Sequence, residues 1–122
     1  MSIRHGFYAR WRGAEYEASP DGDRVRLYAG RSAEGFARVA DDRYVRVVPV
    51  ADVDRLVYVT TFCTWRGEPF SILGEHEGWL RVEYTGGRAP VAERLGLEPF
   101  DRGVYQGWAP RGEVGDLHEE SV

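Results

Sequence analysis

Two short stretches of the chain repeat each other, and this repeat decides how the rest of the sequence is interpreted. Residues 10–16 read RWRGAEY and residues 64–70 read TWRGEPF, so Trp-Arg-Gly and a following aromatic residue recur 54 positions apart. A second set of matches lies 61 positions apart: Tyr44 and Tyr105, Pro49 and Pro110, Val53 and Val114, and Leu56 and Leu117. Recurrence at a nearly fixed spacing is typical of an internal duplication. We therefore expect residues 10–56 and 64–117 to superpose as two similar β units, with Trp11 on Trp65 and Pro49 on Pro110.

The change in spacing places about seven extra residues inside the second copy. Residues 89–96 (APVAERLG) can accommodate these extra residues, and we expect one short helix over 90–95. Pro90 stands near the start and Gly96 at the end, as expected for helix termini.

The remaining pattern predicts short strands and tight turns. The run 56–65 (LVYVTTFCTW) has the highest β-propensity in the chain, and we expect it to be a central strand shared by both copies. The other predicted strands are 6–19, 25–28 and 44–49 in the first copy, and 69–73, 79–84 and 104–109 in the second. The acidic end, residues 113–122, is expected to be a frayed tail.

The length of 122 residues suits one compact body made of two small β units, residues 1–60 and 61–122. The single cysteine, Cys63, excludes an intrachain disulfide and a thiolate zinc cage. No apolar run reaches the roughly 18 residues of a membrane span, and the first residues lack the apolar stretch of a secretion signal. The sequence predicts a cytoplasmic protein that binds no membrane.

Charge is distributed unevenly along the chain. All 16 basic residues are arginine against 20 acidic residues, so the net charge is −4. Residues 1–60 carry +1 and residues 61–122 carry −5. Proteins that bind nucleic acid usually have a basic excess that displaces phosphate counterions, so we expect no nucleic-acid partner.

The second copy carries a family resemblance. Residues 68–74 (EPFSILG) and 78–82 (GWLRV) resemble the strand, loop and Trp-led strand of bacterial SH3-like domains. The resemblance implies a mainly β fold of two tandem SH3-like β-barrel units. It implies no peptide recognition, because the loop lacks the long acidic insertion of eukaryotic peptide-binding SH3 domains.

The candidates for chemistry are few. Cys63 could act as a nucleophile with His5, His76 or His118, but its position inside an apolar β run favours a buried core thiol. A metal ion could bind at Glu75, His76 and Glu77 if residues elsewhere in the chain supplied further ligands. We favour a charged turn that faces a basic partner, because this use requires only that the side chains be exposed. Since no catalytic or phosphate-binding motif occurs, we expect no catalytic residue, metal or cofactor.

The aromatic residues divide into repeated and unrepeated positions. Trp11, Tyr16, Trp65 and Phe70 recur in both copies and are predicted to fill the cores. Trp79 and Trp108 break the repeat, which is expected of an acquired binding site. The predicted partner-binding surface comprises Trp79, Tyr84, Tyr105, Trp108, Glu75, Glu77, Glu83 and Asp101, an aromatic centre with an acidic rim.

These features favour a non-enzymatic protein-binding module. A small, acidic, aromatic-rich chain without catalytic motifs is similar in kind to the immunity proteins of bacterial polymorphic toxin systems, which implies a basic toxin domain as the partner. The alternative is an SH3-like domain that binds a small molecule or nucleotide in a pocket at the seam of the two copies. An enzyme using Cys63 or His76 is a third interpretation.

Overall fold

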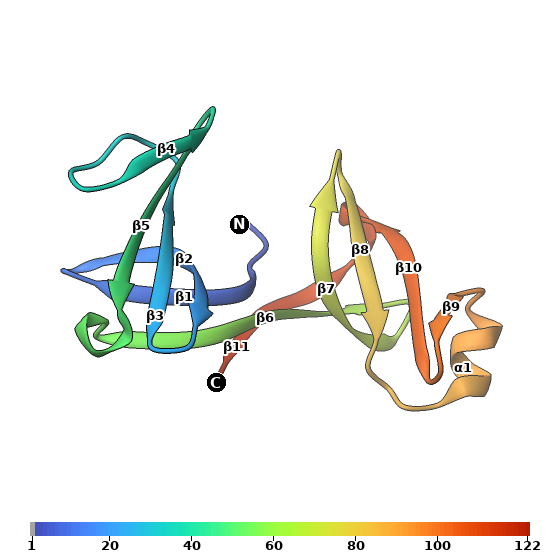
Figure 1. The fold of residues 1–122 in the computed structure, drawn as a ribbon. Coiled ribbons are helices and arrows are strands. Elements are labelled where there is room, and N and C mark those ends of the chain that lie inside the picture. The colour runs from blue at the N-terminus through green and yellow to red at the C-terminus, as the bar shows by residue number, and fades with distance from the viewer. Residues whose placement is uncertain (1) are drawn as a thin grey trace. The chain divides into compact units, whose positions relative to one another are not determined.

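The computed structural model describes residues 2–122 as antiparallel strands with one short α-helix (Figure 1). A mainly β fold was predicted and is confirmed. The strands are β1 (His5–Trp11), β2 (Ala14–Asp21), β3 (Arg24–Ala29), β4 (Ala37–Ala40), β5 (Arg43–Pro49), β6 (Arg55–Trp65), β7 (Glu68–His76), β8 (Trp79–Tyr84), β9 (Glu98–Asp101), β10 (Val104–Pro110) and β11 (Gly115–Ser121). The helix is α1 (Ala89–Arg94), and two 3-10 turns follow β5 and β10, η1 (Val50–Asp52) and η2 (Arg111–Glu113).

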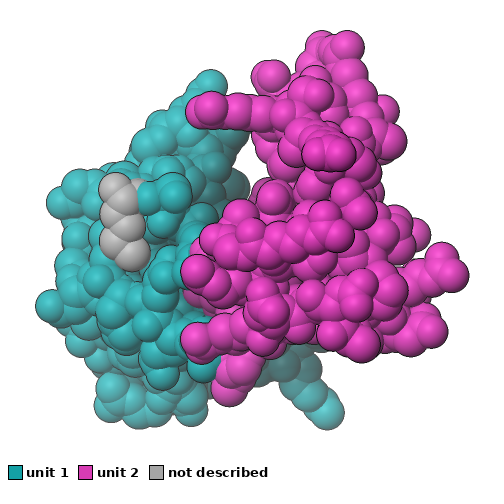
Figure 2. Space-filling view, turned by 90° about the vertical axis from the view of Figure 1, so that its left-hand side faces the viewer, with its two compact units in different colours: residues 1–5, 60–121 teal, residues 6–59, 122 magenta. Residues whose placement is uncertain are grey.

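The chain divides into two compact units, coloured separately in Figure 2. Unit 1 contains residues 60–121 together with residues 2–5 of the described chain, and unit 2 contains residues 6–59 and Val122. Strand β6 contributes residues 55–59 to unit 2 and residues 60–65 to unit 1. The run predicted as the central strand is therefore one continuous strand that supplies residues to both units.

The elements of the two units follow the same order apart from α1, which occurs in unit 1. Unit 2 runs through β1, β2, β3, β4, β5, η1 and the first part of β6, and unit 1 runs through the rest of β6, β7, β8, α1, β9, β10, η2 and β11. The Trp-Arg-Gly stretch forms the first hairpin turn in each. Arg12 and Gly13 have φ of 50° and 79°, and Arg66 and Gly67 have φ of 52° and 77°. In both turns a guanidinium lies over the preceding indole, at 4.3 Å in unit 2 and 4.4 Å in unit 1.

Strand register also corresponds between the units. In unit 2, Val25 of β3 faces Val48 of β5, and in unit 1, Leu80 of β8 faces Ala109 of β10. All four side chains are buried in the core of their own unit. This shared register allows the outward positions of the two sheets to be compared residue by residue.

Three of the four repeated aromatic residues are buried in the cores, as predicted, and Tyr16 is half-buried against the core of unit 2. Trp11 and Trp65 are buried, and Phe70 is completely enclosed. The Trp65 and Phe70 rings meet edge to face, with centroids 5.5 Å apart, and Trp11 meets Tyr16 in the same way at 6.2 Å. Each of these aromatics therefore stabilises one small core, where an enclosed ring contributes several kcal/mol.

Two features differ from the prediction, one in the first copy and one in both copies. Residues 6–19 form two strands rather than one, because the Arg12-Gly13 turn reverses the chain between β1 and β2. Strands β4 and β9 were missed because their residues are all exposed and carry no apolar alternation. The predicted helix is confirmed as α1.

The prediction of a frayed C-terminal tail was wrong. Residues 115–121 form β11, which pairs with β6. Arg4 Nε donates to Glu119 Oε2 at 2.9 Å, and Thr64 Oγ1 donates to Asp116 Oδ2 at 2.9 Å. Two of the acidic side chains that indicated a solvated tail, Asp116 and Glu119, are thus hydrogen-bond acceptors on a paired strand.

The Arg4–Glu119 pair predicts a pH-dependent stability. The hydrogen bond from Arg4 lowers the pKa of Glu119 below its ordinary value of 4.5. The stabilisation by the Arg4–Glu119 pair is therefore present above the pKa that Glu119 has in the unfolded chain. It is lost as the pH falls through the lower pKa of Glu119 in the folded chain. We expect Glu119→Gln to reduce the free energy of unfolding by roughly 0.5 kcal/mol at pH 7, a value limited by solvent screening, and to have no effect near pH 2.

Urea denaturation at both pH values measures this effect. Glu120→Gln is the matched control, because Glu120 is more exposed and its ion-pair partner is His118 rather than an arginine. Equal losses for the two variants at pH 7 would contradict the assignment.

Candidate functional site

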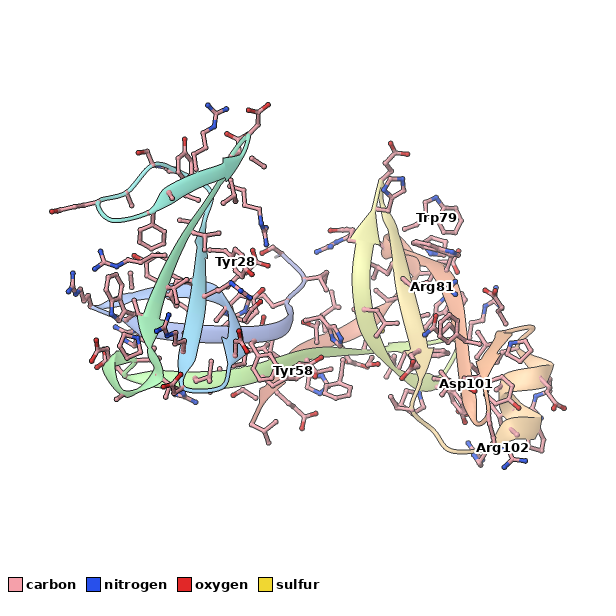
Figure 3. All side chains as sticks on the ribbon, viewed as in Figure 1. Tyr28, Tyr58, Trp79, Arg81, Asp101 and Arg102 are labelled. Carbon is pink, nitrogen blue, oxygen red and sulfur yellow. The ribbon has the colours of Figure 1, made fainter. Side chains whose placement is uncertain are left out.

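Alternation along β8 separates a buried and an outward face of unit 1. Leu80, Val82 and Tyr84 point into the core. The residues between them therefore project from the opposite face of the sheet, since successive side chains of a strand point to opposite sides. Figure 3 shows two of these outward residues, Trp79 near the tip of the β7–β8 hairpin and Arg81 next along the strand.

Trp79 and Trp108 are the large aromatic residues of this outward face, and each is 48% exposed. His76 pairs with Trp79 across β7 and β8, while Trp108 pairs with Arg81 across β10 and β8. The rings of His76, Trp79 and Trp108 line an open cavity of about 350 Å³. We call these three residues the aromatic notch.

A polar network holds Trp108 from one side. The Arg81 guanidinium lies over the Trp108 ring, 5.3 Å from its centroid. Arg81 Nε donates to Gln106 Oε1 at 3.2 Å, and Arg81 Nη2 donates to Glu98 Oε2 at 3.0 Å. Gln106 is buried and donates in turn to Glu83 Oε1 at 3.1 Å. The exposed indole is thus positioned before any partner arrives, which reduces the entropy lost on binding.

The charges at the hairpin tip beside the notch are mainly acidic. Glu75 is neutralised by Arg111, with Oε2 and Nη1 2.6 Å apart. Glu77 follows in the turn with a side chain 84% exposed, and its carboxylate lies 3.8 Å from the His76 ring nitrogen. Unit 1 has seven arginines and eleven acidic residues, a net charge of −4, whereas unit 2 has nine of each.

Tyr84 and Tyr105 line a different cavity, of about 220 Å³, together with Arg88. Tyr84 is buried, and its hydroxyl donates to Glu68 Oε1 at 3.2 Å. Arg88 Nη2 donates to the same oxygen at 3.0 Å. Trp79 and Tyr84 stand at opposite ends of β8, about 17 Å apart along the strand, and on opposite faces of it.

The predicted partner-binding residues therefore fall into separate groups. Those at the hairpin tip are Glu75, Glu77, Trp79 and Trp108, and those at the other end of the sheet are Tyr84, Asp101 and Tyr105. Figure 3 shows Asp101 at the end of unit 1 opposite Trp79. Glu83 lies between the groups and is engaged by Gln106.

Sequence reasoning missed Arg81 and Gln106. Arg81 stands two residues after Trp79 on the same strand, and this spacing alone places it on the same face. Gln106 is the only side-chain amide of the chain, but its partners Arg81 and Glu83 lie 25 and 23 positions away and become apparent only from the β8–β10 register.

Unit 2 has no counterpart of the notch at the matching positions. Arg26 faces Val47 where Arg81 faces Trp108, and Arg24 faces Pro49 where Trp79 faces Pro110. Val47 is 49% exposed, as open as Trp108 but aliphatic. The notch is therefore a feature of unit 1.

Residues 3–122 match the family model described as uncharacterised conserved protein UCP033725. The chain belongs to this family. No curated protein and no solved structure matches the chain.

Among the helices of residues 2–122, none has the length and apolar character needed to cross a membrane. Within the same residues, no group of three or more His, Cys, Asp and Glu side chains is arranged to hold a metal ion. The Glu75, His76 and Glu77 side chains thus do not form a metal site by themselves.

Cys63 is a core residue of unit 1, as the sequence predicted. It is 3% exposed, and burial raises the pKa of its thiol to about 11. His118, one of its three candidate partners, instead stacks on Phe62, with ring centroids 5.7 Å apart, and its Nδ1 lies 2.9 Å from the Asp116 carbonyl oxygen.

This burial predicts an unreactive thiol. At pH 8 the thiolate is scarce and shielded from reagents, so a thiol-specific disulfide reagent should modify native Cys63 at least about a hundredfold more slowly than the urea-unfolded chain. The measurement is the rate of absorbance change in the two states. Rapid modification without unfolding would support a nucleophilic role instead.

Proposed function

We propose that the chain is a non-enzymatic protein-binding module whose partner surface is centred on the aromatic notch. The observation that carries this proposal is the pair of half-exposed tryptophans, one of them held by a satisfied polar network. Tryptophan is enriched among residues that dominate binding energy, and a positioned, partly exposed indole loses little conformational freedom when it is covered.

The partner is proposed to be basic. Unit 1 carries the negative charge of the chain, and the exposed Glu77 carboxylate lies at the hairpin tip beside the notch. An acidic surface increases the association rate of a basic protein at low ionic strength.

The more particular form of the proposal is a bacterial immunity protein that binds and neutralises a toxin enzyme in the cytoplasm. Its support is the combination of an acidic unit, a preorganised aromatic centre and a buried cysteine. Such a partner complex would block the toxin's substrate site without any chemistry by this chain.

We also propose that each unit is an SH3-like barrel and that the two arose by duplication. The support is the common order of elements, the matching Trp-Arg-Gly turns and the equivalent β3–β5 and β8–β10 registers.

A second candidate function is favoured by the smaller cavity. Two tyrosines and Arg88 line a cavity of about 220 Å³, which is large enough for a small anionic molecule. The Arg88 guanidinium already forms an ion pair with Glu68. The residues that line this cavity all belong to unit 1, so it supports a small-molecule site within that unit and not the pocket at the seam that the sequence suggested. A small nucleotide or sugar phosphate that raises the melting temperature of the wild type but not that of Arg88→Ala would favour this small-molecule function.

The binding proposal predicts opposite behaviour of two matched variants. Trp108→Ala should weaken binding of the basic partner at least about thirtyfold, because truncating a central anchor costs about 2 kcal/mol or more. Val47→Ala, at the matching and equally exposed position of unit 2, should leave the affinity unchanged. Quantitative capture from the source cell, followed by calorimetry with the purified partner, measures both.

A basic protein that is captured equally well by wild type and Trp108→Ala but lost by Val47→Ala would place the surface on unit 2. The immunity form of the proposal further requires that the partner be an enzyme and that one equivalent of this chain inhibit it.

A further inference from the structure

We infer that the aromatic notch receives an arginine side chain of the partner, with the guanidinium stacked between the Trp79 and Trp108 rings and its charge facing Glu77. This inference rests on the proposed function and names the chemistry of the contact at its centre.

The ring composition of the notch favours a cation. Its lining consists of two indoles and an imidazole, and indole faces attract guanidinium and ammonium groups more strongly than other aromatic side chains do. Within residues 2–122 neither indole stacks on another aromatic ring. The Arg81 guanidinium over Trp108 demonstrates this attraction within the chain itself.

The charge balance around the notch also favours a cation over an apolar side chain. Arg81 would repel an incoming cation if it were uncompensated, but Glu98 and Gln106 engage its guanidinium at 3.0 and 3.2 Å. Arg111 is neutralised in the same way by Glu75. Within residues 2–122, the carboxylate at the hairpin tip that no arginine engages is therefore that of Glu77, which lies 3.8 Å from the His76 ring nitrogen.

Arginine fits this arrangement better than lysine. A guanidinium is planar, more weakly hydrated than an ammonium, and able to stack on an aromatic face while its edge donates to a carboxylate. The open cavity of about 350 Å³ offers ring faces for the plane, and Glu77 offers an acceptor beside them.

The test compares two peptides that differ only in charge at nearly identical shape, acetyl-Gly-Arg-Gly-amide and its citrulline analogue. Each is titrated into the full ¹⁵N-labelled chain at pH 8 and constant ionic strength, and the four indole N–H signals are followed. The arginine peptide should shift the Trp79 and Trp108 signals and bind at least about threefold more tightly than the citrulline peptide. Equal affinities, or shifts confined to Trp11 and Trp65, would overturn the inference.

Two variants distinguish the contribution of the Trp108 ring to arginine binding from that of the Glu77 carboxylate. Trp108→Leu keeps an apolar side chain but removes the π face, so it should abolish the preference for arginine over citrulline. Glu77→Gln should weaken the arginine peptide about twofold or more and leave the citrulline peptide unchanged, because the exposed carboxylate acts through charge. A preference that survives in both variants would contradict the proposed contact.

The outcomes also distinguish this inference from the proposed function. If Trp108→Ala abolishes partner capture but the peptides show no preference, the surface is correct and the arginine assignment is wrong. If arginine is preferred but Trp108→Ala captures the partner as well as wild type, the chemistry of the notch is correct and the protein-binding surface lies elsewhere.

Discussion

The packing of the buried face of β8 is the constraint on which the functional surface depends. Leu80 and Val82 are completely enclosed, so the strand cannot shift by one residue without exposing both and burying Arg81 and Glu83. The β8–β10 register then sets which residues meet on the outer side, and it places Arg81 opposite Trp108. The position of the notch is therefore a consequence of core packing rather than of local loop structure.

Sequence reasoning succeeded where local pattern and core packing coincide. The run 56–65, the helix near Pro90 and the buried Trp11 and Trp65 all follow from propensity, helix termini or recurrence, and each is found in the structure. It failed for β11, because the acidic composition of residues 115–121 conceals acceptors for Arg4 and Thr64. Those partners are distant in sequence, so only the fold brings them together.

The candidate site was predicted only in part for a similar reason. Composition singled out Trp79 and Trp108 as departures from the repeat, and both are half exposed, but it grouped them with Tyr84, which lies on the other face of the same strand. An even rather than odd position on β8 is enough to move a side chain from the surface to the core. The pairing register of β8 and β10 determines the polar contacts of the site, because it places Gln106 within hydrogen-bonding distance of both Arg81 and Glu83.

The two units use their arginines differently, and this difference bears on how unit 1 would recognise a partner. In unit 2, Arg12 and Arg46 both lie over Trp11, at 4.3 and 4.8 Å, and Arg43 lies over Tyr28 at 4.2 Å. Arg46 is accommodated by Gly35, where a Cβ atom would clash with the Arg46 guanidinium. Arginines of the same chain thus cover the Trp11 and Tyr28 rings of unit 2.

In unit 1 the corresponding internal contacts leave an aromatic surface uncovered. Arg66 covers Trp65 and Arg81 covers Trp108 from one side, yet Trp79 and Trp108 both remain about half exposed. Apolar side chains gathered on a surface in this way often mark a site of interaction. An arginine from a partner would complete in unit 1, between two molecules, the type of contact that unit 2 makes within itself.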